Sequence, residues 1–356
     1  MHTDQRRHPI RRFIKTKGID AFIVTSIKNV RYLTGFTGSS AFALITPDKN
    51  FVFTDFRYQE QISREVCGWE IIIEKGRRAA TVNALAKRLK IKKLGFESSA
   101  SYEFYKGLDD LKLKLIPASG LIEKARARKG PEEISKIRTA VERAEKAFLK
   151  IKPYVKAGVS EMSVALRLEE QLKKAGCRSV PFEIIVASGA NSSMPHARPI
   201  QKKIEKGDFV IIDWGGEACG YYSDMTRTLL ISGGPSDEKR KIYSIVDDAR
   251  EKAVAAVKAG AGCRAVDAAA RNRIKEAGYG DFFGHGTGHG VGLDVHEAPR
   301  LSWTSKEKIS DGTIVTVEPG IYLPGVGGVR IEDMVLATRE GCEMLTSLSR
   351  KLEVVG

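Results

Sequence analysis

The sequence predicts an α/β protein made of two domains, a small one followed by a larger one. In the first third of the chain, short β-rich runs alternate with segments of helical spacing, as in α/β domains. The charge also changes along the chain: residues 1–130 carry 26 Lys and Arg against 13 Asp and Glu, whereas residues 131–356 carry 33 against 31. The segment "KARARKGPEE" separates the two parts. We therefore expect domains at 1–126 and 127–356.

The first part is predicted to alternate strands with helices. Its β-branched and aromatic runs suit short strands, and two segments have helical spacing. "TPDKN" is a turn signal between two of the strands and predicts a hairpin. The glycines of "YLTGFTGSS" lack a phosphate-binding fingerprint and are interpreted as a turn. We expect strands at 21–26, 41–46, 51–56, 70–73 and 93–97, and helices at 81–90 and 101–112.

The second part begins with a long amphipathic helix. Pro131 suits the first turn of a helix, and Glu132 and Glu133 are favourable near its positive end. This helix is expected to run to about Lys152. Glycine-rich β segments fill much of the remainder. Further helices are expected at about 160–175, 237–259 and 263–277.

The composition excludes several classes of protein. Hydrophobic content of 42% and charged content of 29% are ordinary for a soluble globular protein. No apolar run approaches the roughly 20 residues that span a bilayer. The N-terminal "MHTDQRRHPIRRFIK" has no apolar core and is not expected to be a secretory signal. The five cysteines are scattered and never form a CxxC pair, which argues against a disulfide framework and fits a reducing cytoplasm.

The net charge of +15 lies almost entirely in the first part of the chain. Basic clusters such as "KRLKIKKL" lack interleaved aromatic residues and match no nucleic-acid-binding motif. The pattern therefore favours a solvated basic face, and we expect no nucleic-acid partner.

Two segments of the second part share one plan. Residues 206–231 contain a strand with Asp213, a glycine-rich turn and a returning strand with Asp224. Residues 310–338 repeat this plan with two glutamates, Glu318 and Glu332. The repetition predicts a duplicated hairpin, with Asp213 and Asp224 roughly opposite each other on paired strands.

Four acids within apolar strands would be very costly to bury unpaired. One interpretation is that neighbouring arginines compensate them, with Arg227 beside Asp224 and Arg330 beside Glu332. The other is that they hold cations, since two divalent ions balance four carboxylates.

The stretch "GHGTGHGVGLDVHE" holds three of the six histidines, His285, His289 and His296. A single histidine is commonly structural. Three in one glycine-rich segment, in a chain with this carboxylate pattern, favour a binding site instead, because glycines permit the tight turns that let imidazoles converge.

These motifs resemble those of a known family. The acids and histidine above, with "GHGTGHGVGLDVHE" and "GVRIED" around them, resemble the two-metal peptidases of the pita-bread fold. That family includes prolidase, aminopeptidase P, methionine aminopeptidase and the metal-free creatinase, and the resemblance covers most of residues 131–356. "YLTGFTGSS" and "FTDFRY" are similar to the N-terminal domain of the prolidase and aminopeptidase P branch. Methionine aminopeptidases lack that domain and space their glutamates more widely.

The resemblance implies a set of five metal ligands. It implies that Asp213 binds one metal, that Asp224 and Glu332 bridge both, and that His289 and Glu318 complete the other site. The oxygen-rich set favours Mn²⁺ or Co²⁺, with Zn²⁺ as the alternative.

The resemblance also implies roles around these ligands. His196, His285 and His296 would contact the substrate or the reacting carbonyl, although each alone could be an ordinary hydrogen-bonded histidine. Glu318 would shuttle a proton, and Arg330 would orient a ligand carboxylate. Arg300 is similar in position to an arginine that grips a substrate carboxylate in prolidases, or it is a surface arginine after a proline turn.

The implied activity is hydrolysis of the peptide bond that precedes proline. The short chain and Arg300 favour an Xaa-Pro dipeptidase, and the alternative is an aminopeptidase P that acts on longer peptides. A third hypothesis, of another class, is a binding module that keeps the fold without chemistry; such modules usually lose ligands. The resemblance further implies a homodimer in which the N-terminal domain covers the partner's active site.

Overall fold

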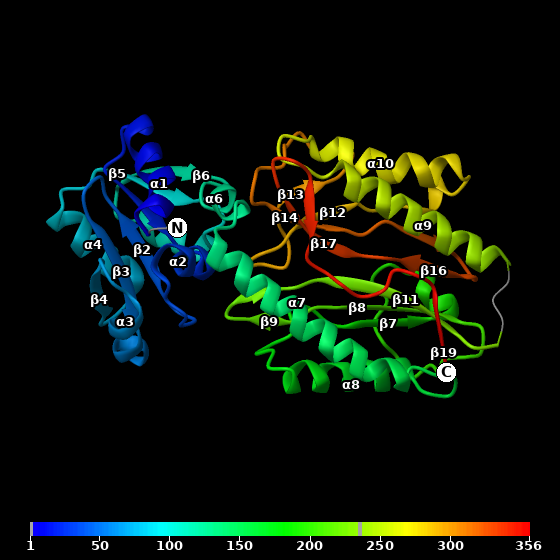
Figure 1. Ribbon diagram of the computed structural model, residues 1–356. Helices are drawn as coiled ribbons and strands as arrows, with labels where there is room; N and C mark the ends of the chain where they lie inside the picture. The colour runs from blue at the N-terminus through cyan, green and yellow to red at the C-terminus, as the bar shows by residue number, and fades with distance from the viewer. Residues whose placement is uncertain (1–2, 234–236) are drawn as a thin grey trace. The chain divides into compact units, whose positions relative to one another are not determined.

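The computed structural model describes residues 3–233 and 237–356, and the chain divides into two compact units, Met1–Arg126 and Ala127–Gly356 (Figure 1). Each unit is described by itself.

The first unit is built on one mixed sheet with helices on its faces (Figure 1). The strand order is β4-β3-β2-β1-β5-β6. The strands are β1 (Ala21–Val24), β2 (Phe42–Ile45), β3 (Asn50–Asp55), β4 (Glu70–Glu74), β5 (Lys93–Glu97) and β6 (Lys114–Ala118). The helices are α1 (Thr3–Lys17), α2 (Ile27–Thr34), α3 (Gln59–Glu65), α4 (Arg78–Arg88), α5 (Tyr102–Asp109) and α6 (Glu123–Ala127), with a short 3₁₀ turn, η1, at Phe56–Tyr58.

The sequence-predicted hairpin of the first unit is confirmed. β2 and β3 pair antiparallel around the "TPDKN" turn, with Phe42 opposite Phe53. Their rings stack at 4.2 Å between centroids and lie in the buried core of this unit. Helix α1 was not predicted from the sequence, because a basic N-terminus gives a weak periodic signal, although its Ile10 and Ile14 are buried.

The helices of the second unit begin close to where the sequence predicts them. α7 starts at Pro131, and the Glu133 carboxylate accepts a 2.9 Å hydrogen bond from the amide of Gly130, which satisfies a free helix N-terminal donor. The helices are α7 (Pro131–Ile151), α8 (Glu161–Lys174), α9 (Asp237–Ala256) and α10 (Cys263–Glu276), with 3₁₀ turns η2 (Lys152–Tyr154), η3 (Gly189–Ser193) and η4 (Gly280–Phe282).

Two curved sheets form the centre of the second unit. One has the order β19-β11-β8-β7 and the other β13-β12-β14-β17-β18. Their strands are β7 (Ile185–Ser188), β8 (Phe209–Trp214), β11 (Met225–Ile231), β12 (Gly288–Gly290), β13 (Glu297–Leu301), β14 (Ile314–Val317), β17 (Asp333–Ala337), β18 (Cys342–Met344) and β19 (Glu353–Val355). Two small hairpins accompany them, formed by β9 (Glu217–Ala218) with β10 (Tyr221–Tyr222) and by β15 (Gly320–Leu323) with β16 (Gly327–Arg330).

Helix pairs cover the outer sides of these sheets. α7 and α8 lie on one side of the unit and α9 and α10 on the other (Figure 1). Phe148 of α7 stacks on Trp214 of β8 at 4.5 Å, and the Trp214 indole N–H donates to the carbonyl of Ala144 at 3.0 Å. The apolar faces of α9 and α10 pack on the second sheet in one buried cluster. This arrangement is the pita-bread fold expected from the resemblance.

The expected duplicated plan is present, with one correction to its register. β8 and β11 pair antiparallel around one small hairpin, and β14 and β17 pair antiparallel around the other. The residue directly opposite Asp213 is Thr226, however, and Asp224 lies just before β11. The offset arises because the turn between the strands forms a hairpin of its own.

Within the described ranges, no helix is long and apolar enough to cross a membrane.

Candidate active site

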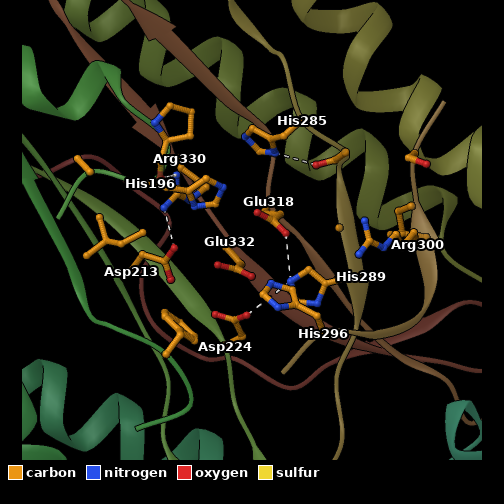
Figure 2. Close-up of a pocket in the computed structure, with 18 of the residues that line it drawn as sticks. His196, Asp213, Asp224, His285, His289, His296, Arg300, Glu318, Arg330 and Glu332 are labelled. Atoms are coloured by element: carbon orange, nitrogen blue, oxygen red, sulfur yellow. Dashed lines mark hydrogen bonds and ion pairs between the residues drawn. The ribbon is translucent and has the colours of Figure 1, made fainter. Parts of the chain in front are cut away.

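One cavity of about 810 Å³ in the second unit is lined by every site residue expected from the sequence (Figure 2). These residues are His196, Asp213, Asp224, His285, His289, His296, Arg300, Glu318, Arg330 and Glu332.

The four acids reach the cavity from corresponding places in the two sheets. Asp213 is on β8 and Asp224 immediately precedes β11, whereas Glu318 directly follows β14 and Glu332 directly precedes β17. A β-bridge between Thr226 and Glu332 joins the two pairs. Their carboxylates point toward a common centre (Figure 2). The duplicated plan therefore brings four acids together from two hairpins.

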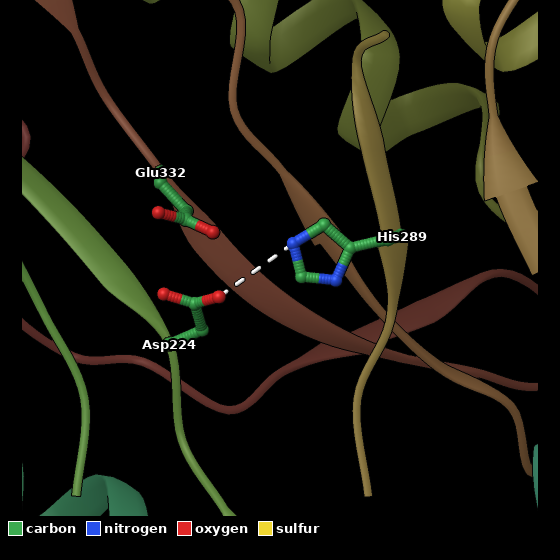
Figure 3. Close-up of side chains that lie close together, drawn as sticks. All are labelled: Asp224, His289 and Glu332. Atoms are coloured by element: carbon green, nitrogen blue, oxygen red, sulfur yellow. Dashed lines mark ion pairs between the residues drawn. The ribbon is translucent and has the colours of Figure 1, made fainter. Parts of the chain in front are cut away.

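His289 enters the same centre from β12, where the backbone is closely packed. A Cβ at Gly288 would lie 2.0 Å from the carbonyl oxygen of Thr316, so only glycine allows β12 to approach β14 here. One ligand atom from each of Asp224, His289 and Glu332 lies within 4.8 Å of the others (Figure 3). The Nε2 atom of His289 lies 3.6 Å from Asp224 Oδ2 and 3.3 Å from Glu318 Oε1.

The hydrogen bonding of His289 fixes which ring nitrogen faces the acids. Its Nδ1 lies 3.1 Å from the carbonyl oxygen of Gly290, which can only accept, so Nδ1 carries the proton. Burial lowers the pKa of His289, which favours the neutral ring. A neutral ring with Nδ1 protonated presents the lone pair of Nε2 to two carboxylates. Lone pairs that converge in this way fit a cation between them.

The negative charges of the carboxylates are not fully balanced by neighbouring positive groups among the described residues. Burial, followed by repulsion from neighbouring acids, raises the pKa of Asp224 and of Glu332 well above the ordinary values. Burial also raises the pKa of Glu318. Asp213 Oδ1 is buried and accepts no hydrogen bond. An oxygen-rich donor set with one histidine and an unsatisfied carboxylate oxygen fits divalent metal ions.

The interpretation that adjacent arginines compensate these acids is wrong in its pairings. Arg227 bonds to Asp333 at 2.8 Å rather than to Asp224, because it points away from the cavity. Arg330 donates to Asp213 Oδ2 at 2.6 Å rather than to Glu332. Asp224 and Glu332 therefore keep no arginine ion pair among the described residues.

Sequence reasoning missed three hydroxyl groups that orient these side chains. Thr226 donates to Glu332 Oε2 at 2.8 Å, and Thr316 donates to Glu318 Oε1 at 3.2 Å. The Tyr322 hydroxyl accepts a 2.9 Å bond from Arg330 and lies 2.9 Å from His285 Nε2. Thr226 lies in "MTRT", two residues after Asp224, and Thr316 and Tyr322 lie in "TVEPGIY" on either side of Glu318, but single hydroxyls carry no motif of their own.

The remaining site residues lie toward the opening of the cavity. His196, His296 and Arg300 are exposed, and the rings of His289 and His296 lie 4.4 Å apart. Arg300 is the register partner of His289 on the neighbouring strand, so both side chains point to the same face of the sheet. Both ring nitrogens of His285 are engaged, Nδ1 by the carbonyl of Gly286 at 2.8 Å and Nε2 by Tyr322. The cavity therefore has an acidic floor, formed by the four acids and His289, and a basic rim, formed by His196, His296 and Arg300.

Two family models match this chain. The model described as metallopeptidase family M24 matches residues 135–339. The model described as the creatinase/prolidase N-terminal domain matches residues 6–128.

Individual proteins match over nearly their full lengths. An uncharacterized peptidase of Bacillus subtilis is 43% identical over 95% of this chain and 96% of its own. The solved structure of an Xaa-Pro dipeptidase from Bacillus anthracis superposes with a TM-score of 0.97 at 41% identity, covering 99% of this chain and 100% of that one. An X-Pro aminopeptidase structure from Thermotoga maritima gives a TM-score of 0.88 at 38% identity, covering 95% and 98%.

Proposed function

The chain belongs to metallopeptidase family M24, and on that premise we propose that it is an Xaa-Pro dipeptidase that uses two divalent metal ions. The observation that carries the proposal is the cluster of four carboxylates and one neutral histidine on the cavity floor. An X–Pro bond is a tertiary amide without an N–H, so peptidases that need this donor cannot cleave it, and a dedicated enzyme is required.

In this proposal the five acidic and imidazole side chains are the metal ligands. Asp213 would hold one ion, His289 with Glu318 would hold the other, and Asp224 and Glu332 would contribute to both. The ions would be Mn²⁺ or Co²⁺ rather than Zn²⁺, since the ligand set has four carboxylates and one imidazole, and no cysteine among the described residues lines the cavity. The unbonded Oδ1 of Asp213 supports its assignment, because a metal would supply the missing partner.

Different residues of the chain then act in different steps of amide hydrolysis. When bound, the two ions supply Lewis acidity toward the scissile carbonyl and lower the pKa of a water molecule. Glu318 accepts the proton of the attacking water and passes it to the proline nitrogen as the C–N bond breaks. His296 or His196, at the exposed side of the cavity, donates a hydrogen bond to the carbonyl oxygen as negative charge develops on it.

His285 has a different place in this mechanism from the other two histidines. Its Nδ1 donates to a carbonyl oxygen and its Nε2 faces the Tyr322 hydroxyl, so a neutral ring has no N–H left for the substrate. We therefore propose that His285 packs against the substrate through its ring and that Tyr322 and Arg330 hold it in place.

The choice of dipeptidase over aminopeptidase rests on Arg300. A dipeptide substrate ends in a free carboxylate one residue past the scissile bond, and a guanidinium can grip it with two hydrogen bonds. Arg300 is exposed, lines the cavity and shares a face with His289. The names of the relatives include both activities, so an Xaa-Pro aminopeptidase is the second candidate.

We further propose that residues 1–126 form an N-terminal domain that covers the active site of a partner subunit in a homodimer, and that residues 127–356 form the catalytic domain. The side chain of Phe56 in "FTDFRY" is 79% exposed. A large apolar side chain exposed in this way supports such a contact. The five cysteines are scattered along the sequence without a CxxC pair, and this supports a cytoplasmic enzyme. A monomer in solution with undiminished activity would contradict the dimer.

One panel tests the proposed function. The purified protein is assayed on dipeptides with proline in the second position, on matched tripeptides and on the same dipeptides with alanine in place of proline. We expect Xaa-Pro dipeptides to be cleaved fastest. Faster cleavage of the tripeptides would identify an aminopeptidase, and a preference for the alanine peptides would contradict both activities.

A further inference from the structure

Arg227 lies behind the cavity floor and uses every hydrogen-bond donor that it has. Its side chain is 3% exposed. Nε donates to the carbonyl of Ser349, and NH2 donates to the carbonyl of Leu348 and to Asp333 Oδ1. NH1 donates to the carbonyls of Thr226 and Glu332 at 2.9 and 2.6 Å. A guanidinium has five N–H groups, so all five are satisfied.

Two of these acceptors belong to the backbone that carries proposed metal ligands. Thr226 lies two residues from Asp224, and Glu332 is itself a proposed ligand. The amide of Glu332 also donates to the carbonyl of Thr226 at 3.1 Å, so the two strands meet at one short bridge. NH1 of Arg227 bonds to the carbonyls on both sides of this bridge. The guanidinium therefore bonds to both segments without touching either ligand carboxylate.

Asp333 holds this guanidinium in position. Asp333 is fully buried, and its Oδ1 accepts from Arg227 and from Thr346 at 2.8 Å each. Its Oδ2 accepts from Arg350 at 2.9 Å and lies 3.3 Å from Arg250. The carboxylate therefore links Arg227 to Arg250 of α9 and to Thr346 and Arg350 of the C-terminal segment.

Repulsion between two of the acids opposes a short separation of their chain segments. One carboxylate oxygen of Asp224 and one of Glu332 lie within 4.8 Å of each other, and like charges at such a distance repel. Their chain segments are joined by one β-bridge and by the hydroxyl groups of Thr226 and Thr228, and they share fewer backbone hydrogen bonds than two fully paired strands. A group outside the ligand set that bonds to both segments therefore helps to hold them at a metal-binding separation.

We propose that Arg227 is a positioning residue that holds the Asp224 and Glu332 segments at their metal-binding separation before any metal arrives. The inference rests on the ligand set of the proposed function and adds to it a residue outside the cavity. If Arg227 has this role, the affinity of the site for metal depends on a side chain that does not itself bind the metal.

The test compares Arg227→Lys with Arg350→Lys. Both variants keep the positive charge beside Asp333, but a lysine has three donors and cannot reach the five acceptors of Arg227. Arg350 shares the Asp333 carboxylate and, among the described residues, makes no hydrogen bond to Thr226 or Glu332, which makes it the matched control. Metal-free proteins, checked for native folding by circular dichroism, are titrated with Mn²⁺ by equilibrium dialysis, and electron paramagnetic resonance reports whether the ions are spin-coupled.

We expect wild type and Arg350→Lys to bind two coupled ions per chain. In Arg227→Lys, at least one ion should bind about tenfold to a hundredfold more weakly, the range typical for residues that orient metal ligands, and the spectrum should be that of uncoupled Mn²⁺. A folded Arg227→Lys that binds two coupled ions with wild-type affinity overturns the inference alone. Fewer than two ions on the wild-type protein overturns the proposed ligand set, and the inference with it.

A measurement on the unaltered protein covers the case in which Arg227→Lys does not fold. Hydrogen exchange of the metal-free wild type should protect the amide of Glu332 as strongly as the amides within β17. Rapid exchange of the Glu332 amide in the metal-free protein, with protection only after Mn²⁺ is added, would show that the metal rather than Arg227 brings the segments together.

Discussion

Arg330 donates a 2.6 Å hydrogen bond to one oxygen of Asp213 and leaves the other oxygen buried and without a hydrogen bond. The same guanidinium donates to Thr226 Oγ1 at 3.1 Å, to the Tyr322 hydroxyl at 2.9 Å and to the carbonyl of Pro195 at 3.1 Å. Arg330 therefore turns the free oxygen of Asp213 toward the cavity while it ties together the threonine and tyrosine that orient neighbouring side chains.

Arg330→Lys should lower both activity and metal retention. Lysine keeps the charge but cannot make the planar set of bonds, so Asp213 loses its fixed orientation. We expect a loss of about tenfold to a hundredfold in metal affinity, with a fall in kcat. The measurement is kcat, KM and bound metal after dialysis. Arg339→Lys is the control, since Arg339 is 86% exposed and should change nothing. Unchanged metal content in Arg330→Lys would contradict this role.

Asp224→Ala and Glu332→Ala should each cost more activity than His196→Ala. Loss of a carboxylate that is proposed to bridge both ions would disturb both of them, whereas loss of a hydrogen-bond donor to the carbonyl oxygen costs about a hundredfold to a thousandfold in kcat. The comparison is kcat/KM on one Xaa-Pro dipeptide, with folding of each variant checked by circular dichroism. The reverse order in folded variants would reject the assignment of roles.

Gly288→Ala should weaken metal binding, although glycine and alanine differ by one methyl group. The new Cβ would lie 2.0 Å from a backbone oxygen of β14, so β12 and His289 must move. Overpacking of this kind typically costs about 1–3 kcal/mol of stability. The control is Gly284→Ala, where a Cβ meets nothing within 4 Å. Equal melting temperatures and metal affinities for the two variants would show that β12 adapts without consequence.

Much of the site could be predicted because its residues break a pattern. Asp213 stands in the apolar run "FVIIDW", and three histidines cluster among glycines, so each departs from what burial alone would select. The two hairpins were predictable for the same reason, since alternation and glycine-rich turns mark strands locally. The family resemblance then supplied the role of each residue.

The partners of the arginines could not be predicted, because they depend on which strands meet in three dimensions. Arg227 is three positions from Asp224 in the sequence, yet its guanidinium contacts Asp333 and the carbonyls of residues 348 and 349. The register of β8 and β11 differs from the predicted one because β9 and β10 take up the intervening residues. Long-range packing decides both features, and it leaves no local signal.

Arg300→Ala separates the two candidate activities. If the guanidinium binds the free carboxylate of a dipeptide, its loss removes charge-assisted hydrogen bonds worth about 1.5–3 kcal/mol, which corresponds to a rise in KM of roughly tenfold to a hundredfold. A tripeptide places its carboxylate elsewhere, so its KM should change little. The measurement is KM for a matched Xaa-Pro dipeptide and Xaa-Pro-Ala tripeptide. An equal effect on both substrates would remove Arg300 as the reason for dipeptide preference.

Hydrolysis before proline should depend on metal ions held by the acidic floor of the cavity. The most direct test strips the purified protein with a chelator, removes the chelator by dialysis and follows cleavage of an Xaa-Pro dipeptide as Mn²⁺ or Co²⁺ is added back. We predict no measurable cleavage in the stripped protein and a return of activity that is complete at two ions per chain. Full activity in a sample shown by elemental analysis to contain no metal would contradict the account.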